Sequence, residues 1–193
     1  DLGVVNILAD SDGAVYSGGH LNGLRKRHAR LRARLQAKGT RSAKRLLRKR
    51  RQKEGRFGRA VNHVISKQVV AKAKDTLRGI ALEDLGGIRQ RITVRKAYRR
   101  QHHAWSFDQL RRFITYKAAM AGVPVALVDP RNTSRTCPAC GLVDKANRLS
   151  QAVFLCTSCG YGGPADVIAA LNIRVRGRAA GNQPDAAAPA SCE

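Results

Sequence analysis

The sequence is poor in acidic residues and lacks long apolar runs. Asp and Glu total 13 against 37 Lys and Arg in 193 residues, which gives a formal net charge of +24. So basic a protein repels itself unless a polyanion neutralises it, and nucleic acid is the usual polyanion because each neutralised phosphate releases counterions. A membrane surface is the alternative, but no apolar run approaches the roughly 18 residues of a membrane span. The basic stretch also lacks the Trp- or Phe-rich opposite face of a membrane-surface helix. The composition therefore predicts a nucleic-acid partner and no membrane.

We expect no signal peptide, and the chain is poor in cysteine. Four of its five cysteines form two C-x-x-C pairs, Cys137, Cys140, Cys156 and Cys159. Two such pairs can hold four thiolates about 2.3 Å from one Zn²⁺. Gly141 and Gly160 follow each pair, where a tight turn favours a residue tolerant of positive φ. We therefore expect a closed, structural zinc site and a cytoplasmic, reducing location rather than disulfides, with Cys192 as a bystander.

The first half of the sequence predicts a hairpin and several helices. Two apolar runs in residues 1–16 flank Ser11-Asp12-Gly13, a strong hairpin signal. Residues 24–53 are Arg-rich and are interrupted only at Gly39 and Thr40, which favours two helices or a helical hairpin. Residues 59–78 carry apolar side chains at four-residue steps, typical of one face of a packed helix.

The second half alternates strands with helices. We expect a buried strand from Gly79 to Leu85, a loop over 89–104, and an amphipathic helix from Phe107 to near Gly122. A short strand over 123–128, the cysteine-bearing segment, a helix over 164–176 starting at Pro164 and a disordered tail over 177–193 follow. Such alternation indicates an α/β domain.

Four acids stand out because they lie at the ends of predicted elements. Asp1 begins the first strand, Glu83 and Asp84 end a buried strand, and Asp166 lies in the first turn of a helix. Each taken singly fits a solvated strand end or an acid at a helix N-terminus. Taken together they suggest the carboxylates that hold two divalent metal ions for phosphodiester hydrolysis. Oxygen ligands suit Mg²⁺, whereas thiolates do not.

The order of these motifs resembles the TnpB family of transposon-encoded, RNA-guided DNA endonucleases, which are often labelled transposases. The resemblance rests on DLG, SDG, the Arg-rich segment, ALEDL, WSFDQLRRF, VDPRNTSRTCPACG and CTSCGY followed by ADVIAALNI, and it covers about residues 1–176. It implies an RNase H-like (RuvC) fold with a mixed sheet, flanking helices and an inserted four-cysteine zinc ribbon. Asp1, Glu83 and Asp166 match the three catalytic, Mg²⁺-binding acids of the family.

The resemblance also implies partners and domain boundaries. We expect DNA and a guide RNA as partners, with backbone contacts by Arg45, Arg48, Lys49, Arg50 and Arg51. The expected organisation is a RuvC-like domain over 1–130 with an Arg-rich insertion near 24–58, a zinc ribbon over 131–163, the last RuvC helix over 164–176 and the tail over 177–193.

Three departures from the family pattern shape the expected activity. The strand residues that precede the first Asp and the N-terminal RNA-gripping domains have no counterpart here, and Ile168 stands where the family has Asn. We therefore expect a C-terminal fragment that binds nucleic acid and cleaves weakly on its own. A non-catalytic, nucleic-acid-binding zinc-ribbon protein and a DNA strand-transferase (a true transposase) are the alternatives. The acid trio distinguishes the first of these, and the reaction product distinguishes the second.

Overall fold

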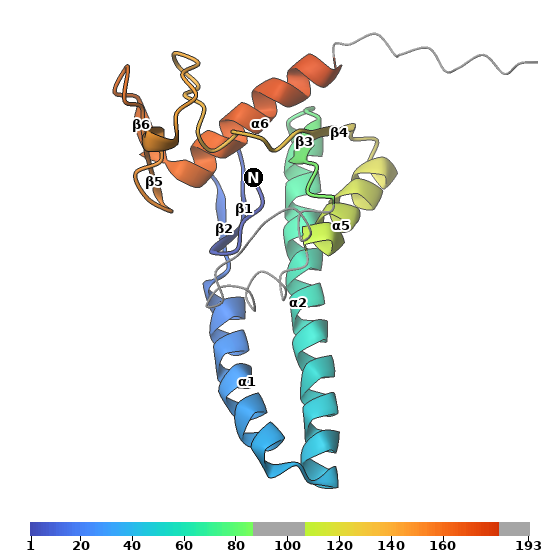
Figure 1. Cartoon of the computed structure of the whole chain (residues 1–193). Coiled ribbons are helices and arrows are strands. Elements are labelled where there is room, and N and C mark those ends of the chain that lie inside the picture. The colour runs from blue at the N-terminus through green and yellow to red at the C-terminus, as the bar shows by residue number, and fades with distance from the viewer. Residues whose placement is uncertain (87–106, 182–193) are drawn as a thin grey trace, which may run out of the picture.

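A long helical hairpin projects from a body of strands and helices, with the cysteine-bearing ribbon at the edge of that body (Figure 1). The computed structural model describes residues 1–86 and 107–181. The predicted loop over 89–104, Trp105, most of the tail and Cys192 lie outside the described residues. In the part of the chain that is described, no helix is long and apolar enough to cross a membrane.

The chain begins with the predicted β-hairpin. Strand β1 (Asn6–Ala9) pairs antiparallel with β2 (Val15–Ser17). The turn between them is closed by Asp10, whose Oδ1 accepts hydrogen bonds from the backbone N–H groups of Asp12 (3.0 Å) and Ala14 (2.8 Å). Gly13 has φ +91°, a value that L side chains rarely adopt. The Asp-Gly signal in the sequence thus marks the turn correctly.

The Arg-rich segment forms the predicted helical hairpin, which we call the basic arm. It consists of α1 (Gly19–Lys38) and the first part of α2 (Arg41–Asp75). Gly39 ends α1 with φ +65°, and the Thr40 side chain caps α2 by accepting a hydrogen bond from the N–H of Ala43 at 3.2 Å. The break at these two residues confirms the prediction.

The separate helix predicted over 59–78 is wrong as a separate element, because α2 is continuous from the arm into the body. Gly55 and Gly58 lie inside the helix, where each costs about 1 kcal/mol relative to Ala. Gly58 is buried against α1: a Cβ there would lie 4.0 Å from Leu21 Cδ1. Packing of α1 on α2, together with the absence of Pro, keeps the helix intact through both glycines.

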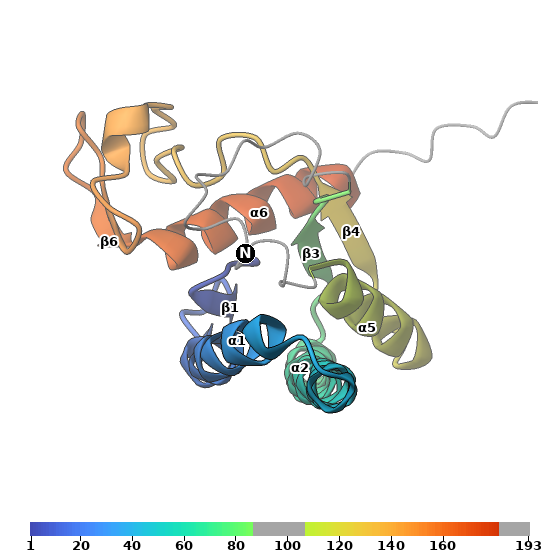
Figure 2. The same ribbon diagram turned by 60° about the horizontal axis from the view of Figure 1, so that its bottom comes forward.

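The body is built from a parallel strand pair covered by helices. Strands β3 (Ile80–Glu83) and β4 (Val125–Val128) pair parallel in register, so that Glu83 lies opposite Val128. Helix α5 (Phe107–Met120) packs along α2, and α6 (Ala165–Gly181) crosses β3 and β4 and reaches β1 (Figures 1 and 2). Gly177 allows this crossing, since a Cβ there would overlap the Cβ of Ala81.

The strands form three separate two-stranded sheets, β1–β2, β3–β4 and β5–β6, so the fold is mixed helix and sheet. The single mixed sheet expected of an RNase H-like domain is not formed among the described residues. The backbone of Asp1–Gly3 runs beside β1, with hydrogen bonds between Asp1 and Ala9 and from Gly3 to Ile7. Within residues 1–86 and 107–181, no further strand joins the hairpin to β3.

Two hydrophobic cores lie under these elements. The larger core joins β1, α2, β3 and α5 through residues such as Ile7, Ile65, Leu110 and Ile114. The smaller core belongs to the ribbon, which contains η1 (Lys145–Asn147), β5 (Val153–Leu155) and β6 (Gly162–Pro164). Pro164 therefore ends β6 rather than opening α6. Residues 177–181, expected to be disordered, continue α6 because Gly177 packs on Ala81.

Candidate metal and nucleic-acid sites

The four ribbon cysteines converge on one point. Their Sγ atoms all lie within 4.8 Å of one another, with Cys137 and Cys159 at 3.6 Å and Cys140 and Cys156 at 3.6 Å. A tetrahedral zinc with Zn–S bonds of 2.3 Å requires S···S separations of about 3.8 Å. Gly141 (φ +77°) and Gly160 (φ +71°) follow each pair as predicted. The cluster is thus shaped to hold a four-coordinate metal ion.

The ionisation of the thiols also suits a metal. A hydrogen bond from the backbone N–H of Cys159, working against burial and helped by that of Ser158, lowers the pKa of Cys156 to about 6. For Cys159, a hydrogen bond from the backbone of Tyr161 lowers the pKa. Burial and the three other thiols outweigh it and raise the pKa to about 12. The cluster therefore carries part of its thiolate charge at neutral pH, and a divalent cation would displace the remaining protons.

A buried asparagine, which the sequence did not single out, organises the ribbon. The Asn147 amide donates to the carbonyls of Arg135 (2.9 Å) and Leu142 (3.2 Å), and its oxygen accepts from the N–H and hydroxyl of Thr157 (3.0 and 3.1 Å). These bonds tie the first cysteine loop to the second. No local pattern marks this residue, because its partners lie in both loops.

Glu83 is the most buried of the candidate catalytic acids. It ends β3 with 6% of its surface exposed and accepts a hydrogen bond from the Thr133 hydroxyl at 2.9 Å. Burial raises the pKa of Glu83, opposed by the N-terminal ammonium group, Thr133 and Arg176. Its neighbour Asp84 is exposed and pairs with Arg111 at 3.2 Å. Glu83, the last residue of β3, thus lies in the interior, and Asp84, the next residue after the strand, lies outside.

Asp166 occupies the first turn of α6 and is mostly buried. Its Oδ2 accepts a hydrogen bond from the Asn6 amide at 2.8 Å, and its Oδ1 lies 3.5 Å from Arg148 Nη2. Asn6 belongs to β1 and Arg148 to the ribbon, so three segments meet at this carboxylate. Neither partner was predicted from the sequence. Asn6 lies 160 residues before Asp166, and Arg148 is separated from it by the second cysteine loop.

Asp1 lies near these two acids. Its α-amino group donates to the carbonyl of Ala9 at 3.0 Å. Burial lowers the pKa of that amino group, while the charges of Glu83, Asp166 and Asp10 oppose the change. The three segments that carry the predicted acids therefore lie close together. Among the described residues, however, the four cysteines are the only set of three or more His, Cys, Asp or Glu side chains whose ligand atoms lie within 4.8 Å of one another.

The loop before the ribbon is fixed by α6. The Asn172 amide donates to the carbonyls of Thr133 (2.7 Å) and Thr136 (2.8 Å), and Arg176 donates to those of Asp129 and Arg131. Thr133 in turn contacts Glu83, so helix, loop and buried acid form one hydrogen-bonded series. Ile168, which stands at the family's Asn position, is buried in the ribbon core.

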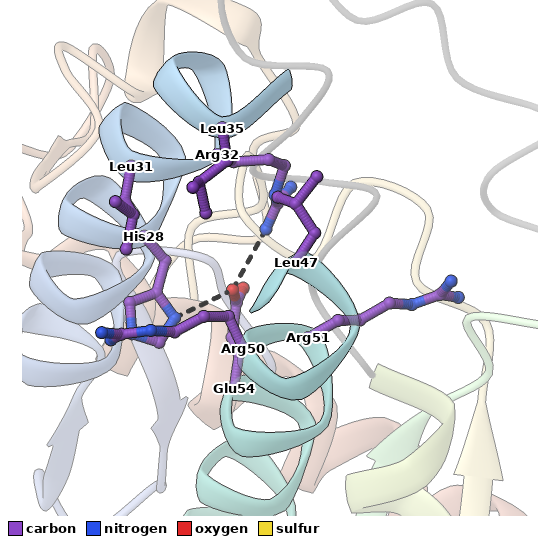
Figure 3. Close-up of a pocket in the computed structure, with 8 residues that line it drawn as sticks. All are labelled: His28, Leu31, Arg32, Leu35, Leu47, Arg50, Arg51 and Glu54. Atoms are coloured by element: carbon purple, nitrogen blue, oxygen red, sulfur yellow. Dashed lines mark hydrogen bonds and ion pairs between the residues drawn. The ribbon is translucent and has the colours of Figure 1, made fainter. Parts of the chain in front are cut away.

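The basic arm is held together by a single acid. Glu54 accepts hydrogen bonds from His28 (3.3 Å) and Arg32 (3.1 Å) of α1, beside a small cavity (Figure 3). Leu31, Leu35 and Leu47 form the apolar part of that cavity. The five cations predicted to contact nucleic acid remain exposed on α2: Arg45, Arg48, Lys49, Arg50 and Arg51.

Comparison with known proteins shows what the chain is similar to. A family model described as Cas12f1-like, TNB domain matches residues 107–173. The chain is 37% identical over 126 residues to the CRISPR-associated endodeoxyribonuclease Cas12f1 of Sulfoacidibacillus thermotolerans (65% of this chain, 28% of the relative). It is 36% identical over 112 residues to TnpB-like protein MJ0751 of Methanocaldococcus jannaschii (58% and 40%). It is 31% identical over 198 residues to the putative RNA-guided DNA endonuclease InsQ of Escherichia coli K12 (93% and 48%).

Solved structures show the same likeness in the fold. The Cas12f1 chain in the cryo-EM structure of the Cas12f1–sgRNA–target DNA complex has a TM-score of 0.70 at 20% identity, over 89% of this chain and 47% of that chain. A CRISPR-Cas12f ternary complex gives 0.66 at 22% identity, over 83% and 34%. The chain thus spans less than half the length of each of these relatives.

Fold and site together define a class: a mixed helix-and-sheet protein of Cas12-like fold that carries a four-cysteine metal-binding ribbon. The sequence matches narrow this class further. The chain is similar to TnpB-like and Cas12f proteins, the resemblance that its motif order predicted.

Proposed function

We propose that this chain is the nuclease part of a metal-dependent, RNA-guided DNA endonuclease of the TnpB type. The observation that supports the proposal is the proximity of the Asp1 α-amino group to Glu83 and Asp166, which belong to two distant segments of the chain. The pKa of the Asp1 amino group responds to the charges of both other acids. The proposed fold is RNase H-like, with 1–130 as a RuvC-like domain, the arm as its insertion, 131–163 as the ribbon and 164–176 as its last helix.

The roles of the residues follow from their chemistry. Asp1, Glu83 and Asp166 would hold Mg²⁺, which supplies a nucleophile from water and stabilises the leaving oxygen when bound. Carboxylate oxygens fit this hard cation, and the closed thiolate set fits a structural zinc. Thr133 and Asn6 orient Glu83 and Asp166 through the hydrogen bonds described above.

The basic arm would contact the nucleic-acid backbone. Its five exposed cations lie within one stretch of α2, and Glu54 engages α1 rather than these side chains. The relatives act on DNA or were solved with guide RNA and target DNA, and we propose both as partners here. The cytoplasm, where thiols stay reduced, is the proposed location.

A cleavage assay with Mg²⁺, guide RNA and target DNA tests the proposal. We expect guided cutting by a longer protein that contains this chain, and weak or no cutting by the 193-residue chain. Asp166→Ala and Glu83→Gln should abolish cutting, whereas the adjacent Asp84→Asn serves as the matched control and should retain it. Retained cutting in Asp166→Ala would exclude the assigned active site.

Product analysis addresses the two alternatives. Hydrolysis leaves free 3′ and 5′ ends, whereas a strand-transferase joins one of those ends to a second DNA. A non-catalytic binder would bind DNA without Mg²⁺-dependent change in any variant. Isothermal titration of Mg²⁺ into the short chain gives a further readout, and Asp166→Ala should weaken the binding that it measures.

A further inference from the structure

A row of exposed cations continues from the basic arm along α2 into the body. Its members recur at intervals of three, four or eight residues, which places them on one helix face turned away from α1. The row consists of five exposed cations and one half-buried histidine: Arg45, Arg48, Arg56, Arg59, His63 and Lys67. The arm residues discussed above account for only two of the six.

Where this row reaches α5, two aromatic rings of α5 join His63. His63 stacks on Phe113 of α5 with ring centroids 4.0 Å apart and an interplanar angle of 24°. Tyr116 meets Phe113 edge-on at 6.0 Å. The two helices lie side by side here (Figures 1 and 2), and the rings therefore sit at the seam between them.

Cations border these rings. The Arg59 guanidinium lies 5.9 Å from the Phe113 centroid, and Lys117 Nζ lies 5.8 Å from Phe113 and 5.9 Å from Tyr116. Lys117 also donates to the carbonyl of His63 (2.8 Å) and the hydroxyl of Ser66 (2.6 Å), which fixes α5 on α2. The ring cluster is thus held in place before any ligand arrives.

The cluster is not simply interior packing. Tyr116 is 43% exposed, and Met120, one turn further along α5, is 84% exposed. Burial, together with the charges of Lys117 and Arg59, lowers the pKa of His63, so its ring is neutral at neutral pH. An exposed ring beside cations that track a backbone is the combination that single-stranded nucleic acid requires, because unpaired bases stack on rings while phosphates meet the cations.

We propose that this α2–α5 surface binds single-stranded DNA, with a base stacked on Tyr116 and the phosphates along Lys67, Arg59 and Arg56. The preference for a single strand follows from the rings, since a duplex keeps its bases paired and stacked. The choice of DNA over RNA rests on the proposed function, in which the strand to be cut must leave its duplex.

Fluorescence anisotropy with labelled oligothymidylate over a series of salt concentrations tests the proposal. Tyr116→Ala should weaken binding about tenfold, because the loss of about 1.4 kcal/mol of base stacking corresponds to that factor. The salt dependence of binding should not change, since the ring carries no charge. Tyr116→Phe keeps the ring and should bind as the parent does. Met120→Ala is the matched control for loss of an exposed apolar side chain on the same helix.

Arg59→Gln should act differently from the ring variants. Removing one phosphate-binding cation lowers the slope of log K against log salt by about 0.7 for a single strand. An unchanged affinity in Tyr116→Ala, or an equal loss for a duplex of the same sequence, would overturn the proposal. Tighter binding of oligouridylate with the same sensitivity to Tyr116→Ala would overturn the choice of DNA.

The outcome is separable from that of the proposed function. Asp166→Ala removes a proposed metal ligand far along the chain from α2 and α5, and it should leave oligothymidylate binding intact. If cleavage fails while binding follows these expectations, the nuclease assignment falls and the single-strand surface stands.

Discussion

Asp12, in the turn between β1 and β2, anchors the hairpin to the end of α2. It accepts two hydrogen bonds from Arg78 (2.9 and 2.8 Å) and lies 2.8 Å from Lys72. The hydrogen bonds from Arg78, and to a lesser degree that from Lys72, hold the pKa of Asp12 well below its ordinary value of 3.8. A depressed folded-state pKa stabilises the protein above the unfolded pKa, and this stabilisation is lost as the pH falls through about 4 toward the lower folded value.

Asp12→Asn should therefore lower the free energy of unfolding at neutral pH by about 1 kcal/mol, the scale of a partly exposed ion pair. The difference from the parent should shrink as the pH falls below about 4, since Asp12 then becomes protonated in the unfolded parent while the folded parent keeps its carboxylate charged to a lower pH. Urea unfolding across a pH series measures both. Asp75→Asn, at an exposed acid of the same helix end, is the control and should show no such pH dependence.

Leu77 follows the C-terminus of α2 in a left-handed conformation, with φ 53°, and is 95% exposed. A non-glycine residue in that conformation costs about 1–2 kcal/mol. Glycine avoids this cost, but part of the gain is lost because glycine gives the unfolded chain more conformational entropy. Leu77→Gly should therefore raise the free energy of unfolding by about 1 kcal/mol. Leu77→Ala removes the same exposed side chain, keeps the strain and should leave stability near that of the parent, as thermal unfolding would show.

At the scale of elements, the sequence predicted what is locally encoded. The Asp-Gly turn, the break at Gly39 and the apolar β3 depend on neighbours in sequence, and all three are found. The continuity of α2 was missed, because the packing of Gly58 on α1 is a tertiary effect. The partners of the acids, Thr133 for Glu83 and Asn6 for Asp166, were also missed, since nothing local marks a contact between distant segments.

The crossing of α6 over β3 depends on the absence of one methyl group. A Cβ at Gly177 would overlap that of Ala81, so Gly177→Ala should destabilise the protein by about 1–3 kcal/mol despite the higher helix propensity of Ala. Adding Ala81→Gly should restore much of the loss. Denaturant unfolding of the two single variants and the double variant measures the coupling, and additive effects would mean that the helix has room to shift.

The ribbon should fold only with its metal, because its own core is small and built around Cys137 and Cys156. Purified protein should contain about one zinc per chain, and Cys137→Ser should lower this content and unfold the ribbon. The helices of the larger core should persist, as circular dichroism would show. Cys192→Ser is the control. Full zinc content in a Cys137→Ser/Cys156→Ser double variant would contradict the assignment.

For the whole molecule, the basic arm should dominate non-specific binding. Charge reversal at Arg45, Arg48, Lys49, Arg50 and Arg51 should flatten the salt dependence of duplex binding by about 0.9 for each phosphate that the arm no longer neutralises. The control reverses exposed cations of the ribbon side, Arg131, Arg135 and Lys145, and should change the slope less. An unaltered slope in the arm variant would place the backbone-binding surface elsewhere.

The length of α2 has a consequence for how the charges of this molecule influence one another. Between Arg48 in the arm and Lys72, which contacts Asp10 near the acids, the helix rises about 36 Å. At physiological ionic strength the field of an exposed charge decays over about 8 Å. Arg45 and Arg48, near the tip of the arm, are therefore more than four screening lengths along α2 from Lys72, and these two cations neither repel a divalent ion from the acids nor neutralise them. Attraction of a polyanion by the tip of the arm and the proposed cation binding by the acids would thus occur at opposite ends of one rod, and neither would sense the other's charge.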